Sequence, residues 1–216
     1  QMCTRDSHLL KRVPIQAGLG GGSADAAAML LGLNRFWDLR LTQEELLNIG
    51  ASLGSDVPFL LQGGTARGTG RGEVLTYSQS PEAHWLLLVK PKVSISTAVA
   101  YGRFNGKSNA TAKTIDTVLN HLQNNDLQSA FTSSANTFEE LLFPDHEELT
   151  ICKEFFTSRG YPTIMTGSGP TMVVLLNKPM EALQLQEEIK VAGHDWLSLI
   201  TKTCTPVSYT HLTLPT

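Results

Sequence analysis

The sequence has no run of apolar residues that approaches the ~20 needed to span a bilayer. The apolar segment from His84 to Val89 has the length of a buried strand instead. No positively charged segment followed by an apolar one stands near the start of the chain. We therefore expect a protein without a membrane partner that is not secreted.

Cysteine is scarce, and its few copies are scattered. The three cysteines, Cys3, Cys152 and Cys204, form no Cys-x-x-Cys unit. This favours free thiols in a reducing compartment over a disulfide framework. The six histidines also lack the spacing of metal ligands, so no structural zinc is predicted.

An excess of basic residues is absent as well. The formal net charge is −3, with 41% hydrophobic and 17% charged residues, as in an ordinary globular protein. Binding nucleic acid through bulk charge requires clustered lysine and arginine, so we expect no nucleic-acid partner of that kind. A local basic groove would still be compatible with this composition.

Helix and strand periods alternate along the sequence, which predicts a mixed α+β chain. The first part is predicted to contain strand Leu9–Ile15, a helix from about Ser23 to Trp37, a helix from the capping box Thr42-Gln-Glu-Glu45 to about Gly54, and β-like segments Phe59–Gln62 and Gly64–Thr69. The second part is predicted to contain strands Trp85–Lys90, Tyr161–Thr166, Thr171–Leu176 and Trp196–Thr203, with helices Ser96–Phe104, Thr114–Asn124, Ser134–Leu142, Asp145–Arg159 and Met180–Val191. The order of these later elements suggests a split βαβ sandwich, and Asn105 to Lys113 is predicted to be a mobile loop.

A glycine-rich loop stands between a predicted strand and a predicted helix. It reads Gly18-Leu-Gly-Gly-Gly-Ser23. Glycines let a backbone approach a phosphate closely, and the helix that follows offers unpaired N–H groups and the positive end of its dipole. The Ser23 hydroxyl could donate to a phosphate or coordinate Mg²⁺. Asp25 lies in the first predicted helical turn, where the helix dipole favours a carboxylate, and its alternative role is to cap the helix. The pattern predicts a phosphate-binding loop.

Two common nucleotide motifs do not fit this loop. A P-loop requires a lysine after the glycines, and none is present here. A dinucleotide fingerprint requires a third glycine where Ser23 stands, and no parallel βαβ repeat follows. The residues alone therefore leave the type of phosphate site open, with a tight strand–helix turn as the alternative.

Several ordered motifs resemble the GHMP kinase superfamily, and within it the 4-diphosphocytidyl-2-C-methyl-D-erythritol kinase family. The similar segments are Arg12-Val-Pro14, the triple glycine with Ser-Ala-Asp-Ala-Ala27, Leu53-Gly-Ser-Asp-Val-Pro-Phe59, Gly63-Gly-Thr-Ala66, Thr69-Gly-Arg-Gly-Glu73, Lys90-Pro-Lys-Val-Ser-Ile-Ser-Thr97 and Thr166-Gly-Ser-Gly-Pro-Thr171. Together they run from about Lys11 to Cys204.

This resemblance implies an α+β GHMP kinase fold. It would comprise a partial ribosomal-protein-S5-like N-terminal domain over residues 1–79 and a ferredoxin-like split βαβ C-terminal domain over residues 80–205. Residues 206–216 have little charge and no helix or strand pattern, so we interpret them as a non-native or disordered tail. Because the chain begins at Gln1 with a strand that already enters a functional loop, we expect that an N-terminal segment is missing.

The resemblance also implies a location, in a bacterial cytoplasm or a plastid stroma, and an activity with its residues. ATP would be the co-substrate, with Mg²⁺, and its γ-phosphoryl would pass to the 2-hydroxyl of the family's small-molecule substrate. ATP would lie against the glycine loop and its flanks, namely Pro14, Ile15, Gln16, Ala17, Gly18, Leu19, Gly20, Gly21, Gly22, Ser23 and Ala24. A second loop, Gly167, Ser168 and Gly169, would approach the phosphates, or would be only a β-turn between two strands. No metal ligand is assigned beyond Ser23 through Mg-ATP.

Asp56 is the candidate catalytic base, because it lies in a Gly-Ser-Asp-Val-Pro loop where burial and a nearby cation could tune it. The alternative is that it only turns the loop before Pro58. The family pairs this aspartate with a lysine near the native N-terminus that this sequence lacks. We interpret Lys11 and Arg12 as solvated cations, and Arg67 and Arg71 as facing either a substrate diphosphate or solvent. Two other functions stay open: another GHMP small-molecule kinase, or a catalytically incomplete nucleotide-binding fragment.

Overall fold

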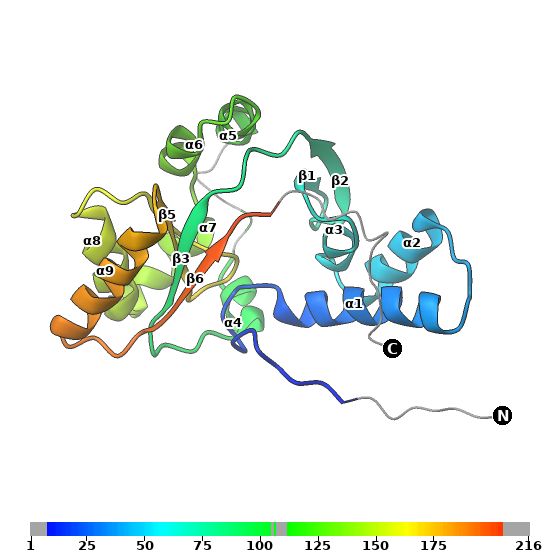
Figure 1. Ribbon diagram of the computed structural model, residues 1–216, viewed down its shortest axis with the longest axis horizontal. Helices are drawn as coiled ribbons and strands as arrows, with labels where there is room; N and C mark the ends of the chain where they lie inside the picture. The colour runs from blue at the N-terminus through cyan, green and yellow to red at the C-terminus, as the bar shows by residue number, and fades with distance from the viewer. Residues whose placement is uncertain (1–7, 105, 107–111, 205–216) are drawn as a thin grey trace.

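The computed structural model describes residues 8–104, 106 and 112–204, and it shows two groups of elements joined side by side (Figure 1). The first group consists of helices α1 (Gly21–Phe36), α2 (Gln43–Leu53) and α3 (Val57–Gln62) and strands β1 (Thr65–Thr69) and β2 (Val74–Ser78). The second group consists of strands β3 (Trp85–Lys90), β4 (Thr163–Met165), β5 (Met172–Leu176) and β6 (Leu197–Lys202), with helices α4 (Thr97–Gly102), α5 (Ala112–Gln123), α6 (Leu127–Ser133), α7 (Thr137–Leu142), α8 (Glu147–Thr157) and α9 (Pro179–Val191) and the 3-10 turn η1 (Phe143–Asp145).

Local sequence signals fix the ends of the helices in the first group. At the start of α2, the Thr42 hydroxyl accepts the Glu45 N–H, and the Glu45 carboxylate accepts the Thr42 N–H at 2.8 Å. This is the predicted capping box. The three helices pack around a small core of Ala27, Leu46, Val57 and Leu61. They approach closely at Gly50, where an added Cβ would lie 2.9 Å from Leu61 Cδ1.

The second group is built on one antiparallel sheet. Its strand order is β4-β5-β3-β6, with β3 paired to both β5 and β6. In chain order this is the β-α-β-β-α-β arrangement of the ferredoxin-like fold, so the predicted split βαβ architecture is confirmed.

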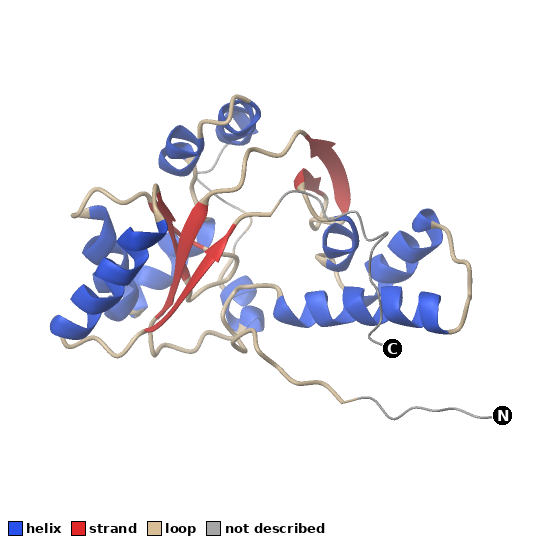
Figure 2. Ribbon diagram, viewed as in Figure 1, coloured by secondary structure: helices blue, strands red, loops and turns tan. Residues whose placement is uncertain are grey.

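Helices lie on both faces of this sheet (Figure 2). Side chains on neighbouring strand residues point to opposite faces, as they must in a β-strand. Leu87 and Val89 join the main core, which is completed by residues of α7, α8, α9 and β5. Leu86 points the other way, into a smaller cluster with Leu127 and Leu175 against α6. Strands β3 and β5 are therefore buried between helices, whereas the edge strand β6 is largely exposed.

The strand predicted at Leu9–Ile15 is wrong. Residues 8–14 are extended or bent, and within the described ranges they pair with no strand, leaving Leu9, Leu10 and Ile15 largely exposed. A strand requires a neighbouring backbone to pair with, which an apolar pattern cannot supply by itself.

The strand predicted at Phe59–Gln62 is also wrong, because this segment belongs to helix α3. Val57 and Leu61 are one helical turn apart and are 1% and 6% exposed, so both face the small core. A short apolar run fits a buried strand and a buried helix equally well. Strand β2 and helix α6 were not predicted, although Asp126 gives a cap signal by accepting the Ser129 N–H at 3.0 Å.

Several remaining expectations concern single residues or the ends of segments. Cys152 and Cys204 are free thiols as predicted, and burial raises the pKa of the Cys152 thiol above its ordinary value. Cys3, the tail at 206–216 and most of the predicted loop at 105–113 lie outside the described residues. Ala112 and Lys113 belong to α5 rather than to that loop. Among the described residues, no helix combines the length and the apolar character that crossing a membrane requires.

The main core predicts a large cost for Phe156→Ala. Phe156 is fully buried and packs edge-on against Phe155, with ring centroids 5.1 Å apart. Truncating a buried phenylalanine leaves a cavity and costs about 3–5 kcal/mol. Urea unfolding should show that loss, whereas Val191→Ala, at a side chain that is 81% exposed, should change the unfolding free energy by less than about 0.5 kcal/mol. Equal effects would contradict this packing.

Candidate active site

The glycine loop ends in an open helix N-terminus. Gly18 and Gly20 have φ angles of 70° and 64°, which favour glycine over residues with a Cβ. Gly20 is the N-cap of α1 and, as a glycine, has no side chain with which to cap the helix. The first N–H groups of α1 are therefore available to an anion, and the helix dipole favours negative charge there.

A cavity of 580 Å³ lies over this helix end and draws its walls from both groups of elements. The residues that line it are Lys11, Pro14, Ile15, Gln16, Ala17, Gly18, Leu19, Gly20, Gly21, Gly22, Ser23, Asp56, Thr97, Tyr101, Gly167 and Ser168. Ten of the eleven predicted ATP-binding residues, Pro14 to Ser23, thus share one cavity with the predicted base and the predicted second loop. Ala24 does not line the cavity, and its backbone N–H makes the intrahelical bond to the Gly20 carbonyl at 2.9 Å.

The two glycine loops are packed backbone against backbone. A Cβ added to Gly18 would lie 2.3 Å from the Thr166 carbonyl oxygen, and one added to Gly167 would lie 2.9 Å from the Gly18 carbonyl oxygen. The Thr166 hydroxyl donates to that same Gly18 oxygen at 3.2 Å. Gly169 does not line the cavity, but its N–H donates to the Thr166 carbonyl at 2.9 Å and closes the turn. Only glycines allow this approach.

Asp56 lies at the cavity without a structural task of its own. It occupies the N-cap position of α3, yet its side chain makes no capping hydrogen bond and is exposed. A Cβ added to Gly54, two residues earlier, would lie 3.9 Å from the Ser23 hydroxyl. The Asp56 loop and the first turn of α1 are therefore neighbours, which places an accessible carboxylate beside the open helix end.

The interpretation of Lys11 as a solvated cation is wrong. Its ammonium pairs with the Asp25 carboxylate, and the two side chains are 28% and 34% exposed. Asp25 therefore holds a cation at the cavity wall rather than capping α1. The sequence could not show this pair, because its members are 14 residues apart across a loop whose path the pattern does not define.

Sequence reasoning missed Thr97 and Tyr101 as lining residues. Both come from α4, which the fold brings beneath the second glycine loop, and the Thr97 and Ser168 hydroxyl oxygens are 3.1 Å apart. The two arginines left open lie elsewhere: Arg67 pairs with Asp116 at 2.8 Å, and Arg71 is 82% exposed beside Glu73. Neither lines this cavity.

The sequence of this chain is similar to those of known kinases. Residues 3–64 match the family model for the GHMP kinases N terminal domain. A 4-diphosphocytidyl-2-C-methyl-D-erythritol kinase of Exiguobacterium sibiricum is 41% identical over 184 residues, 85% of this chain. One of Bacillus cytotoxicus is 39% identical over 168 residues, 77% of this chain.

Solved structures agree with these sequence matches. A crystal structure of 4-(cytidine 5'-diphospho)-2C-methyl-D-erythritol kinase superposes with a TM-score of 0.72 at 26% identity, covering 89% of this chain and 68% of that one. Residues 3–64 thus match a GHMP kinase domain, and the chain has the fold of this kinase structure. This fold is shared more widely, since a homoserine kinase from Cytophaga hutchinsonii gives a TM-score of 0.70 at 16% identity, over 91% of this chain and 68% of that one.

The matched relatives are longer than this chain. The chain spans 64% of the Exiguobacterium protein and 58% of the Bacillus cytotoxicus protein. GHMP kinases use ATP as a co-substrate, and the glycine loop lies within the part of this chain that matches their family model.

The packed loops predict opposite effects of alanine at two glycines. Gly18→Ala places a Cβ against the Thr166 carbonyl at a φ of 70°, so we expect a loss of at least about 1–2 kcal/mol. Gly22→Ala meets nothing within 4 Å and lies inside α1, where alanine should gain about 0.5–1 kcal/mol. Urea unfolding without nucleotide measures both, and a neutral Gly18→Ala would contradict the docking of the loops.

Proposed function

We propose that the protein transfers the γ-phosphoryl group of ATP to the 2-hydroxyl of 4-diphosphocytidyl-2-C-methyl-D-erythritol, a step of non-mevalonate isoprenoid precursor synthesis. One observation carries this proposal: a single cavity collects the open end of α1, the carboxylate of Asp56 and the second glycine loop. The names of the bacterial relatives support the substrate, and their source supports a bacterial cytoplasm over a plastid.

Phosphoryl transfer depends mainly on positioning and on stabilising the charge of the transferring group. The N–H groups of Gly21 and Gly22 would face the nucleotide phosphates, with Ser168 opposite them. Lys11 supplies positive charge at the same wall, and Asp25 fixes its position. These groups would hold the nucleotide so that its terminal phosphate faces Asp56.

Asp56 would accept the proton of the attacking hydroxyl. It is accessible, it lines the cavity, and no hydrogen bond to the helix end competes for its oxygens. Mg²⁺ suits this site because it takes few protein ligands and otherwise binds phosphates and water, and Ser23 in the first turn of α1 and Asp56 at the start of α3 present oxygens to the cavity. When bound, the ion would neutralise charge on the phosphates. Within the described ranges, no cluster of three acidic, histidine or cysteine side chains offers another metal site.

The division of the chain at residues 79 and 80 belongs to this proposal. It falls after β2, which ends at Ser78, and before β3, which begins at Trp85. The N-terminal part would supply the ATP loop and the base, and the C-terminal part would supply the second loop. Each part alone would leave the cavity open on one side.

The substrate is tested by ADP release with three acceptors. The cytidine substrate should support turnover, and homoserine and mevalonate should not. Homoserine is the most informative alternative acceptor, because the homoserine kinase above has the same fold as this chain. Its sequence is only 16% identical to that of this chain. The assay should be run on this chain and on the longest product of its gene, since the chain spans 64% of a matched relative. Turnover only with homoserine or mevalonate would overturn the proposed substrate.

Asp56→Asn should abolish turnover while leaving ATP affinity nearly unchanged. The amide has the shape of the carboxylate but cannot accept the proton, and loss of a general base typically costs about 10²–10⁴-fold in rate. Steady-state kinetics and ATP titration measure the two effects separately. The matched control is Asp38→Asn, the same change at a side chain that is 72% exposed and pairs with the neighbouring Arg40, away from the cavity. Retained turnover in Asp56→Asn would refute its role as the base.

A further inference from the structure

The backbone of Met165, just before the second glycine loop, is held from outside the sheet by two side chains of the α7 segment. The Asn136 amide donates to the Met165 carbonyl at 2.7 Å, and the Glu139 carboxylate accepts the Met165 N–H at 2.7 Å. Met165 is the last residue of β4, an edge strand in the described sheet. The two side chains therefore occupy positions where a further strand would pair.

Asn136 also reaches the loop itself. The same amide nitrogen donates to the Gly167 carbonyl at 2.8 Å, while the Asn136 carbonyl oxygen accepts the Phe138 N–H at 2.9 Å and caps α7. One side chain thus fixes the start of a helix, the last carbonyl of β4 and one carbonyl of the loop that meets Gly18. Capping α7 would require only the oxygen, so the two donated bonds are a separate feature.

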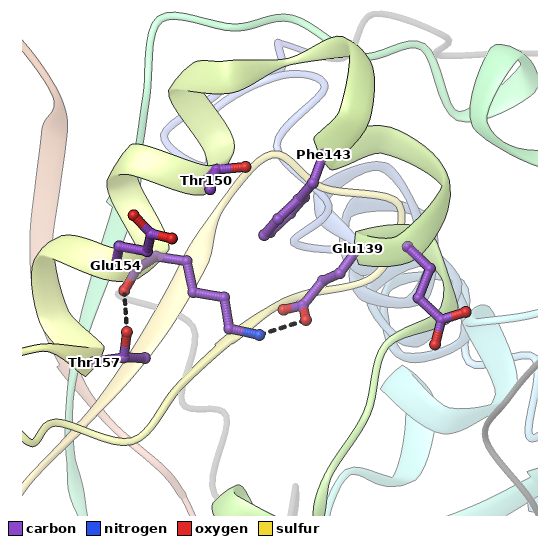
Figure 3. A pocket seen from close by; sticks show the side chains of 7 residues that line it. Glu139, Phe143, Thr150, Glu154 and Thr157 are labelled. Atoms are coloured by element: carbon purple, nitrogen blue, oxygen red, sulfur yellow. Dashed lines mark hydrogen bonds and ion pairs between the residues drawn. The ribbon is translucent and has the colours of Figure 1, made fainter.

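Glu139 is itself held in place. Its second carboxylate oxygen pairs with Lys153 of α8 at 2.5 Å, and only 14% of the Glu139 side chain is exposed. Figure 3 shows Glu139 pointing into a pocket between α7 and α8, where a dashed line marks this ion pair. The carboxylate therefore cannot move away from Met165 without leaving a half-buried ammonium unpaired.

The same helix also supports a further lining residue of the cavity, Tyr101. The ring of Phe138 packs edge-on against Tyr101, with centroids 4.9 Å apart, and Tyr101 lines the cavity. Tyr101 belongs to α4, and so does Thr97, which contacts the Ser168 hydroxyl. α7 is thus linked to the second loop directly and through α4.

We propose that Asn136 and Glu139 are positioning residues that hold the Gly167–Ser168 backbone ready for the nucleotide phosphates. This inference rests on the proposed function, because it assigns the residues to the phosphate side of the same cavity. Glycines at φ angles of 54° and 76°, Gly167 and Gly169, lose much conformational freedom on being ordered. The two side chains order this backbone before ATP binds. Less of the binding free energy is then lost in ordering the loop when ATP binds.

Two changes test the inference against a matched control. Asn136→Asp keeps the oxygen that caps α7 but removes the amide N–H groups that donate to the Met165 and Gly167 carbonyls. A carboxylate oxygen then faces those carbonyl oxygens. Asn34→Asp is the same change at an amide that holds the Leu41 backbone in the same way, accepting its N–H at 2.9 Å and donating to its carbonyl at 3.3 Å, away from the cavity. Thermal unfolding of each variant shows that it is folded before binding is measured.

Calorimetric titration with ADP and with adenosine gives the readout. We expect Asn136→Asp to weaken ADP roughly tenfold, as for the loss of one hydrogen bond to a charged group, and to leave adenosine nearly unchanged. Asn34→Asp should leave both affinities as they are. A second pair distinguishes the Met165 contact from the ion pair: Glu139→Ala should weaken ADP, and Glu139→Gln, which keeps an oxygen for the Met165 N–H, should restore most of the loss.

The outcomes separate this inference from the proposed function. If the unaltered chain binds ADP and Asn136→Asp binds it equally well, the positioning role is overturned and the kinase proposal stands. Equal loss of ADP and adenosine affinity in Asn136→Asp would also overturn it, because that result indicates general damage. If the unaltered chain binds no adenine nucleotide, the proposed function fails and this inference fails with it.

Discussion

The contact between Gly18 and the Thr166–Gly167 backbone is the constraint on which the candidate site depends. The two segments are 148 residues apart in sequence, yet a single added methyl group on either glycine would meet backbone atoms of the other loop. Backbone atoms cannot rotate out of the way as side chains can. The two groups of elements must therefore meet at this point in one arrangement, or the cavity loses a wall.

The rest of the chain serves this contact from two directions. On one side, the small core of α1, α2 and α3 fixes the axis of α1 and the position of the Asp56 loop. On the other side, the four-stranded sheet carries the second loop between β4 and β5, and α7 holds it along the open edge. Phosphate binding by backbone N–H groups requires such rigidity, because a mobile loop would lose much of its binding energy in becoming ordered.

Local patterns in the sequence predicted those parts of the site whose residues are neighbours along the chain. The glycine loop, the capping box of α2 and the aspartate before Pro58 can each be recognised from fewer than ten consecutive residues. The structure brings the glycine loop and this aspartate to one cavity. The split βαβ order also followed from alternating patterns, because the buried strands of that sheet are strongly apolar.

Features that depend on distant partners could not be predicted. The apolar residues from Leu9 to Ile15 fit a strand pattern, but a strand exists only where another backbone pairs with it. The Lys11–Asp25 pair, the Thr97 contact with Ser168 and the Asn136 bonds to Met165 and Gly167 all join segments whose approach is set by the assembled sheet. A charged or amide side chain carries no local signal of such a partner.

Amide hydrogen exchange with and without ATP tests most directly whether the two glycine loops form one phosphate site. If they do, saturating ATP should slow exchange in residues 18–23 and in residues 166–169 together, with the same dependence on ATP concentration. Protection of residues 18–23 alone would show that the second loop takes no part in binding, and would contradict a site built from both halves of the chain.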